Sequence, residues 1–287
     1  MIKIRVTGGL GNQLFQYATA RSLAEKIETS TTMDISVYKS YNVHPFKLAK
    51  FNCKTEFSDK SSLFRKLLEK RFFQKVFMRL GMLGKYYFED GLFFNKKVLS
   101  LQNETKLFGY FQSEKYFINI RQKLLEELTL IDELNDIEQA LSEEIKNSNS
   151  ISIHIRRGDY VSNLSANQIH GTCDSSYFKK SLAYLENKGI LIESSHLYLF
   201  SDDIDWCREN LNFGYNTTFI EGCSERPEVD MILMSRCQHH IISNSTFSWW
   251  GAWLNSNEAK VVIAPIKWFQ SAELDSIDII PESWVKL

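Results

Sequence analysis

Two adjacent arginines, Arg156 and Arg157, follow directly after an apolar, strand-like stretch, "ISIHI" at 151–155. A guanidinium group is rarely buried without a partner, so each of the two needs an acid or an external anion. One of them can hold an acid of the protein such as Asp159, which leaves the other for a ligand. Because arginine keeps its charge and matches the fork of phosphate oxygens, this turn is predicted to bind phosphate. A structural salt bridge is the alternative.

A second polar group follows another strand-like stretch, "HHIIS" at 239–243. Asn244, Ser245 and Thr246 come next, and they begin a helix-like run that continues with Phe247. Hydroxyl groups and free backbone N–H groups at a helix N-terminus favour an anion. The alternative is a helix cap followed by core aromatic residues. Two such groups, both after strands of one domain, favour a phosphate site.

The order of the expected elements places these residues. Strand-like and helix-like stretches alternate along most of the chain, which predicts parallel α/β sheets. In the second half, strands are expected at 151–155, 196–201, 217–221, 239–243 and 260–265, and helices at 176–186, 205–211, 228–237 and 246–254. We expect two doubly wound domains, at 1–149 and 150–287, with ligands beyond the carboxyl ends of the strands. Asp202, directly after the strand at 196–201, therefore joins the candidate residues.

The glycine-rich stretch "TGGLGNQLFQYA" lies between the first expected strand and helix. Gly9 and Gly11 match the start of the GxGxxG pattern that binds dinucleotides, but Leu14 stands where the third glycine belongs. We also find no acidic residue that closes a ribose site. The stretch therefore argues against a nicotinamide-dependent dehydrogenase.

Composition limits the classes of partner. The 34 Lys and Arg against 35 Asp and Glu give a formal net charge of -1, so no overall basic field attracts nucleic acid. The 5 cysteines are scattered without a CxxC pair, and the first residues do not match a secretory signal. No apolar run reaches the roughly 18 residues of a membrane span. We expect a cytoplasmic protein with reduced thiols.

The segment 60–85 is basic and amphipathic. Apolar residues at helical spacing alternate there with lysines and arginines, which predicts a helix or a pair of helices. Two interpretations stay open: a helix packed on its domain with a solvated basic face, or a peripheral contact with anionic lipid at the inner face of the cytoplasmic membrane.

Several stretches together resemble one family. "HIRRGDY", "NSTFSWWGAWL" and "GGLGNQLFQYA" are similar to sequences of the bacterial α-1,2-fucosyltransferases of glycosyltransferase family eleven. "GYFQSEKYF", "FSDDIDWCREN" and "DMILMSRCQHHIISNSTFSWW" extend the likeness over most of the chain, in the order that the family has them. The HxRRxD pattern alone is shared with α-1,6- and protein O-fucosyltransferases, whereas the combination is specific.

The resemblance implies a GT-B architecture, with two Rossmann-like domains that face a cleft. The C-terminal domain would bind GDP-β-L-fucose, and the N-terminal domain would shape the acceptor side. The implied reaction inverts the anomeric centre and places L-fucose on O2 of a terminal galactose, with no cofactor and no metal. The acceptor would be an oligosaccharide or lipid-linked glycan of surface polysaccharide (O-antigen) biosynthesis.

Roles of donor-domain residues are also implied by the resemblance. Arg156 would be the main diphosphate ligand, and His154 a contact near the nucleoside. Arg157 and Asp159 would hold the turn. Asp230 would read guanine through its N1–H and 2-amino groups.

The remaining donor contacts come from the residues at the strand ends. The resemblance implies that Ser245 and Thr246 hydrogen-bond to phosphate oxygens. Asp202, Asn244 and Phe247 complete the expected donor site. A growing negative charge on the leaving GDP can be stabilised by an arginine and a helix N-terminus that are already oriented.

The opening glycines take a different role under this resemblance. Gly8, Gly9 and Gly11 would allow close backbone approach across the cleft between the domains. Asn12 and Gln13 would offer amide groups to the fucose, its phosphates or the acceptor. The alternative is a tight strand-to-helix turn that Asn12 caps.

The attacking hydroxyl group must also lose a proton. Asp34, at the end of the second strand, and Glu114, near "GYFQ", are the candidates for the base, although structural or acceptor-binding roles suit both. Asp203 and Asp205 match the DxD pattern of metal-dependent nucleotide-sugar glycosyltransferases, which is the alternative reading of the site. Asp205 can instead cap the helix that follows. A fucosyltransferase of other linkage, such as α-1,6, is a further alternative.

Overall fold

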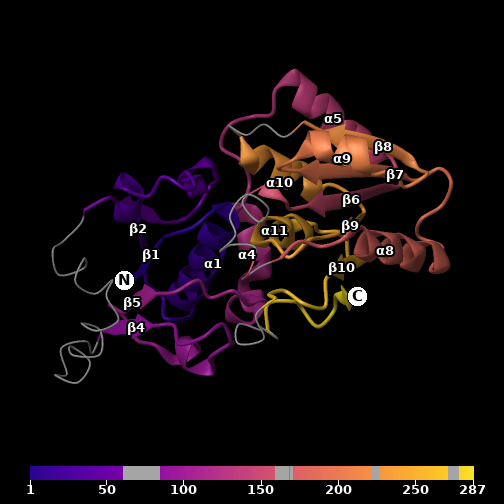
Figure 1. Ribbon diagram of the computed structural model, residues 1–287. Coiled ribbons are helices and arrows are strands. Elements are labelled where there is room, and N and C mark those ends of the chain that lie inside the picture. Colours follow the sequence, from indigo (N-terminus) through magenta and orange to yellow (C-terminus); the bar gives the residue numbers. More distant parts are fainter. Residues whose placement is uncertain (61–84, 159–167, 169–170, 222–225, 271–277) are drawn as a thin grey trace. The chain divides into compact units, whose positions relative to one another are not determined.

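The computed structural model describes residues 1–60, 85–158, 168, 171–221, 226–270 and 278–287 (Figure 1). The chain divides into two compact units, Met1–Thr129 and Leu130–Leu287. The sequence pattern placed this division at 149/150. Helix α5, Asp136–Asn147, contacts strand β6 and helix α10 of the second unit, so the segment before residue 150 belongs there.

The first unit contains a parallel sheet in the order β3-β2-β1-β5-β4. Its described strands are β1 Ile2–Arg5, β2 Thr31–Asp34, β3 Glu56–Ser58, β4 Tyr86–Phe88 and β5 Lys106–Phe108. Its described helices are α1 Leu10–Lys26, α4 Arg121–Glu127 and the short 3-10 turns η1 Ser36–Lys39, η2 Leu48–Lys50, η3 Lys96–Ser100, η4 Glu114–Tyr116 and η5 Ile118–Ile120. The expected strand–helix–strand opening is confirmed.

Helix α1 is the centre of the first unit and is buried along most of its length. Ile2 and Ile4 of β1 alternate with polar residues, and both are buried on the side where α1 contacts the strand. Several polar side chains of α1 are buried as well and bond to neighbouring segments. Tyr17, for example, donates a hydrogen bond to Glu127 of α4, and Arg21 forms an ion pair with the same carboxylate.

The second unit contains a parallel sheet in the order β11-β10-β9-β6-β7-β8. Its described strands are β6 Ser150–Ile155, β7 His196–Ser201, β8 Asn216–Ile220, β9 His239–Ile241, β10 Val262–Ala264 and β11 Val285–Lys286. Besides α5, its described helices are α8 Ser175–Asn187, α9 Ile204–Asn210, α10 Pro227–Ser235 and α11 Thr246–Leu254. The α/β class with two parallel sheets is therefore confirmed.

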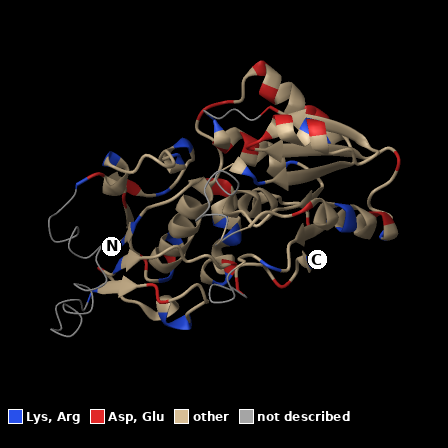
Figure 2. Ribbon diagram, in the orientation of Figure 1, with Lys and Arg blue, Asp and Glu red and all other residues tan. Residues whose placement is uncertain are grey.

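Helices cover both faces of this second sheet. Ile151 and Ile153 of β6 pack with Leu182 of α8 on one face. Tyr198 of β7 packs on the other face with residues of α10 such as Leu233. In Figure 2 the ribbon of α5 carries red acidic positions, whereas that of α11 has no charged position, in agreement with the buried aromatic residues of α11. The strand pattern of period two thus produces a doubly wound unit.

The basic amphipathic segment that we predicted at 60–85 falls almost entirely on residues 61–84, outside the described part of the chain. In that described part, no helix combines the length and the apolar character that crossing a membrane requires.

A single glycine sets the distance between α10 and α11. A Cβ atom added at Gly251 would overlap the Sδ atom of Met234 and lie 2.9 Å from its Cγ atom. Gly251→Ala should therefore lower the free energy of unfolding by about 1–2 kcal/mol, because overpacking exceeds the gain in helix propensity. Urea denaturation measures this change.

A second substitution, at Met234, tests whether overpacking causes the loss of stability. Met234→Ala removes the Sδ and Cγ atoms that the new methyl group would overlap and leaves the Cβ atom at 3.2 Å. The double variant should then lose less stability than the sum of the two single variants. Additive losses would contradict the steric explanation.

Candidate active site

The second sheet has a switch point between β6 and β9. Strands β7 and β8 lie on one side of β6, whereas β9, β10 and β11 lie on the other. Open parallel sheets bind ligands beyond the carboxyl ends of the strands at such a point. The residues that follow β6 and β9 are 156–158 and 242–246, the two polar groups that the sequence predicted.

His154 joins the two strands at this point. Its Nδ1 atom lies 2.8 Å from the Oγ atom of Ser243, and its ring centroid lies 5.6 Å from that of Phe247. Complete burial, with a smaller contribution from the positive charge of Arg156, lowers the pKa of His154 to about 3. The imidazole is therefore neutral near pH 7 and can act only as a hydrogen-bonding group.

Asp202 contacts both arginine residues of the turn, one through its side chain and the other through its backbone. Oδ2 of Asp202 lies 2.9 Å from Nη1 of Arg156, and Oδ1 accepts a hydrogen bond of 2.8 Å from the backbone N–H of Arg157. Asp202 was predicted among the donor contacts. Its place here is that of the acid that orients the arginines, since a carboxylate repels phosphate.

Arg157 is held by two further contacts. Its Nε atom donates to Oδ2 of Asp203 at 3.1 Å, and its guanidinium carbon lies 3.5 Å from the ring centre of Trp206. This geometry suits the structural role that we expected of Arg157. Trp206 was not among the predicted residues, because its place in a helix-like run gave no signal. Asp159, the other residue expected to hold the turn, lies outside the described residues.

Two polar residues at the start of α11, Asn244 and Ser245, have structural contacts. Ser245 is the N-cap, and its Oγ atom accepts a hydrogen bond from the backbone N–H of Phe247. The amide nitrogen of Asn244 donates instead to the carbonyl groups of Gly171 and Trp268, at 3.3 and 3.2 Å. Asn244 therefore orders the loops behind the helix, which differs from its predicted role in donor binding. Thr246 is half-buried in the first turn of α11.

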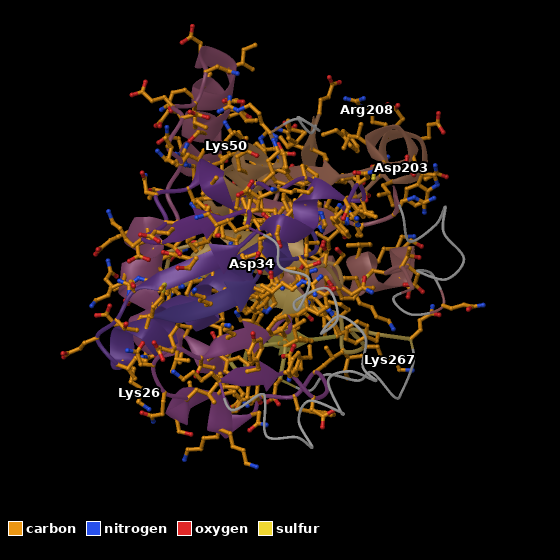
Figure 3. The ribbon with its side chains drawn as sticks, turned by 90° about the vertical axis from the view of Figure 1, so that its left-hand side faces the viewer. Lys26, Asp34, Lys50, Asp203, Arg208 and Lys267 are labelled. Atoms are coloured by element: carbon orange, nitrogen blue, oxygen red, sulfur yellow. The ribbon has the colours of Figure 1, made fainter. Side chains whose placement is uncertain are left out.

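Asp230 and the DxD pair belong to segments that pack on opposite faces of the second sheet, α10 and the start of α9. Asp230 is half-buried in the first turns of α10. Figure 3 labels Asp203, which immediately precedes α9, and Arg208, in the last turn of that helix. Asp203 is paired with Arg157, and the exposed Asp205 lies 3.4 Å from Arg208. Helix α9 begins at Ile204, so the idea that Asp205 caps it is wrong.

The first sheet has a switch point of its own, between β1 and β5. The backbone N–H of Thr7 donates to Oε1 of Gln16, whose Nε2 atom donates to the carbonyl of Gly109 at 2.9 Å. Across the same point, Nε2 of Gln112 donates to Oδ1 of Asn12 at 2.8 Å. The glycine loop after β1 and the turn after β5 are therefore joined by amide side chains.

The glycines of the loop differ in what they require. Gly8 has a φ of +84°, and its carbonyl accepts a hydrogen bond of 2.7 Å from the hydroxyl of Tyr38. Gly9 has an ordinary φ of -71° as the N-cap of α1, with the ring of His44 against it. Gly11 is buried in the first turn of α1. His44, in the loop "YNVHPF", was missed because a lone loop histidine carries no spacing signal.

The prediction that Gln13 offers its amide to a substrate is wrong. Its side chain is fully buried, and its Nε2 atom donates to the carbonyl groups of Gly8 and Pro45 at 3.0 and 2.9 Å. Its Oε1 atom accepts from the backbone N–H groups of Lys47 and Leu48. Gln13 thus fastens the 45–48 loop to α1. The capping role considered for Asn12 is also wrong, because Gly9 occupies the N-cap position.

Asp34 and Glu114, the two candidates for the base, occupy different settings. Asp34 is buried at the end of β2, and its Oδ1 atom accepts a hydrogen bond from the backbone N–H of Ser36 at 3.2 Å (Figure 3). Glu114 begins η4 and is half-buried. Its charge raises the pKa of Arg121 and so opposes the lowering by burial. Whether either carboxylate acts as the base stays a prediction.

The contrast between Gly8 and Gly9 can be tested directly. A Cβ atom at Gly8 would lie 2.6 Å from Nδ2 of Asn12 in a left-handed backbone, whereas one at Gly9 would lie 3.5 Å from the His44 ring. Gly8→Ala should therefore lower the free energy of unfolding by about 1–3 kcal/mol. Gly9→Ala is the matched control and should stay within about 0.5 kcal/mol of the parent. Chemical denaturation measures both, and equal losses would contradict this account of the loop.

Comparison with known proteins gives a consistent set of relatives. An Escherichia coli protein named α-1,2-colitosyltransferase is 40% identical over 297 residues, covering 100% of this chain and 99% of that protein. The E. coli O-antigen biosynthesis glycosyltransferase WbnK is 31% identical and covers 98% and 99%. The galactoside 2-α-L-fucosyltransferase SEC1 of Bos taurus is 27% identical over 52% of this chain and 42% of its own length.

Solved structures agree on the fold. The α-1,6-fucosyltransferase NodZ, in a crystal soaked with GDP-fucose, gives a TM-score of 0.51 at 17% identity over 88% of this chain and 92% of that chain. The E. coli ADP-heptose heptosyltransferase II gives 0.50 at 11% identity over 100% and 89%. Both have the GT-B fold of two Rossmann-like units. The family model described as "Glycosyl transferase family 11" matches residues 1–287. This chain therefore belongs to glycosyltransferase family 11 and is a glycosyl-transferring enzyme.

Proposed function

We propose that this enzyme transfers L-fucose from GDP-β-L-fucose to O2 of a terminal galactose, with inversion, in O-antigen biosynthesis. The observation that carries the proposal is the pairing of Asp202 with Arg156 and Arg157 at the switch point of the second sheet. It orients cationic groups where a parallel sheet binds its ligand. The names of the relatives, O-antigen glycosyltransferase and galactoside 2-α-L-fucosyltransferase, support the pathway, the sugar and the linkage.

The proposed chemistry follows from these groups. The 2-hydroxyl oxygen of galactose bonds to C1 of fucose while the bond from C1 to the diphosphate oxygen breaks, and the electron pair of that bond leaves with GDP. Arg156 and the N-terminus of α11 stabilise the growing negative charge. The hydroxyl proton passes to a carboxylate of the protein, for which Asp34 and Glu114 are the candidates. We propose that the reaction requires no metal, so activity should persist in EDTA.

A second donor deserves a direct comparison, because the relative at 40% identity is named a colitosyltransferase. Colitose lacks the 3-hydroxyl group of fucose. A site that hydrogen-bonds a substrate hydroxyl rejects the deoxy analogue by a factor of about 10⁴–10⁵, whereas an apolar site discriminates only weakly. A site that selects GDP-fucose therefore needs a hydrogen-bonding group near C3 of the sugar, whereas a site for GDP-colitose needs an apolar surface there.

The decisive experiment is a donor and acceptor panel. GDP-fucose and GDP-colitose are each supplied with a set of β-galactosides, and NMR identifies the linkage of the product. We expect the higher kcat/KM with GDP-fucose and an α-1,2 product. Preference for GDP-colitose would assign the second function, and an α-1,6 product would refute the linkage.

The arginine pair can be tested by substitution. Arg156→Ala should lower kcat about 10²–10³-fold, because a charge that stabilises the leaving group is lost, while the fold is kept. Asp202→Asn should lower it less, since the arginines remain but lose their orienting charge. Arg208→Ala is the control, because Arg208 makes surface ion pairs with Glu221 and Asp205 in the same unit. Unchanged turnover in Arg156→Ala would refute the phosphate role.

A further inference from the structure

Glu89 is a carboxylate that neither the sequence nor the proposed reaction has used. It follows β4 directly, at the carboxyl edge of the first sheet, and is half-buried. Its Oε2 atom accepts a hydrogen bond of 2.6 Å from the backbone N–H of Tyr110, and its Oε1 atom accepts one of 2.9 Å from Phe111. Phe111 has a φ of +55°, so these two bonds hold a left-handed turn.

The turn that Glu89 holds lies at the switch point of the first sheet. A Cβ atom at Gly109 would overlap the Cβ atom of Glu89, so the close approach requires glycine. On the other side, Gln16 of α1 donates to the carbonyl of Gly109 at 2.9 Å. Gln112, the next residue after Phe111, donates to Asn12 of the glycine loop. Glu89 and α1 therefore clamp the turn from two sides.

The groups on this turn suit a neutral, hydroxyl-rich ligand. Asn12 and Gln112 are half-buried amides, and Tyr110 is 37% exposed. Amide groups donate to and accept from hydroxyl groups, and an aromatic face covers the C–H groups of a sugar. Arg5 of β1 also acts on this turn, since its charge lowers the otherwise raised pKa of Tyr110.

The ionisation of Glu89 changes around neutral pH. Burial raises its pKa to about 7 even though the two backbone N–H groups lower it. The other ionisable groups near it are Tyr87, whose pKa is raised by burial and by the charges of Glu89 and Asp90, and Tyr110 with Arg5. Since the pKa in the folded state lies above that of the unfolded chain, this group contributes stability at low pH and loses it as the pH rises through 7. A carboxylate with a raised pKa, at the sheet edge where parallel sheets bind ligands, is a candidate for a functional residue.

We propose that Glu89 is a positioning residue of the acceptor site, whose ionised carboxylate orders the Gly109–Gln112 turn against the glycine loop for a galactoside. The ionised form accepts both N–H groups, whereas the protonated form loses one acceptor oxygen. Acceptor affinity therefore falls in acid while the stability contributed by this group increases. The inference rests on the proposed function for the identity of the acceptor.

The test measures the KM for a β-galactoside at saturating GDP-fucose between pH 5.5 and 8.5. In the parent enzyme, this KM should increase about tenfold per pH unit below 7, because the competent fraction decreases in that proportion. Glu89→Gln should show a high KM that does not change with pH. Glu89→Asp should keep the pH dependence, and Asp90→Asn, which alters the exposed neighbouring carboxylate, should follow the parent. In every variant the KM for GDP-fucose should change less than twofold.

Two readouts separate this inference from the proposed function. The backbone amide NMR signals of Tyr110 and Phe111 in the parent protein should titrate with the same midpoint as the galactoside KM, and different midpoints would overturn the inference. If no fucose is transferred at any pH, calorimetry with the galactoside decides. Binding that weakens in acid in the parent but not in Glu89→Gln supports Glu89 while the proposed function fails. Binding that is absent, or equally dependent on pH in both, overturns the inference.

Discussion

The pairing of Asp202 with the two arginines after β6 is the interaction on which the second unit's site depends. Two guanidinium groups side by side repel each other, and neither can be buried without an acid. Asp202, directly after β7, pairs with Nη1 of Arg156 and accepts the backbone N–H of Arg157, while Asp203 pairs with the guanidinium of Arg157. Since β6 and β7 are adjacent parallel strands, the register of the sheet alone places this acid beside the arginines.

The same pairing explains why the turn contains a glycine. A Cβ atom at Gly158 would lie 2.5 Å from Oδ2 of Asp202, the oxygen that holds Arg156. A side chain there would displace the carboxylate and remove the partner of the Arg156 guanidinium and of the Arg157 backbone N–H. Arg157 is further held by Asp203 and Trp206, so side chains of the same unit orient both guanidinium groups. Preorganised charges of this kind need no rearrangement when the leaving group develops its negative charge.

The sequence predicted what depends on periodicity and failed where single contacts decide. Helix α11 begins and ends where its pattern of apolar residues indicates, at 246 and 254, and the doubly wound order follows from alternating elements. Strands such as β4, three residues long, are too short for a period to appear, and Glu89 at its end was missed with it. The first unit ends near Thr129 because α5 finds its apolar partners in α10, a long-range contact that composition does not encode.

Side-chain roles were the least predictable part, and Gln13 shows why. An amide next to glycines in a loop suggests a ligand contact, yet its two donors and two lone pairs are all used by backbone groups of residues 8, 45, 47 and 48. Burial requires this, because an unsatisfied amide inside the protein is costly. Asn12, one position earlier on the same helix, is half-buried, and its Oδ1 atom accepts a hydrogen bond from the side chain of Gln112. The helical turn of about 100° between consecutive residues decides which of the two amides is structural.

Both units have a parallel sheet with a switch point, and the side chains at the two switch points differ in charge. Each sheet has a switch point beside its central strand, and each switch point is bridged by polar side chains. In the second unit the bridge lies beside arginines, a setting for an anionic group. In the first unit it consists of amides beside a carboxylate that titrates near neutral pH, a setting that repels phosphate and accepts hydroxyl groups. Under the proposed function, an arginine-rich switch point suits the anionic donor and an amide-rich one suits the neutral acceptor, so the difference in charge favours one substrate at each.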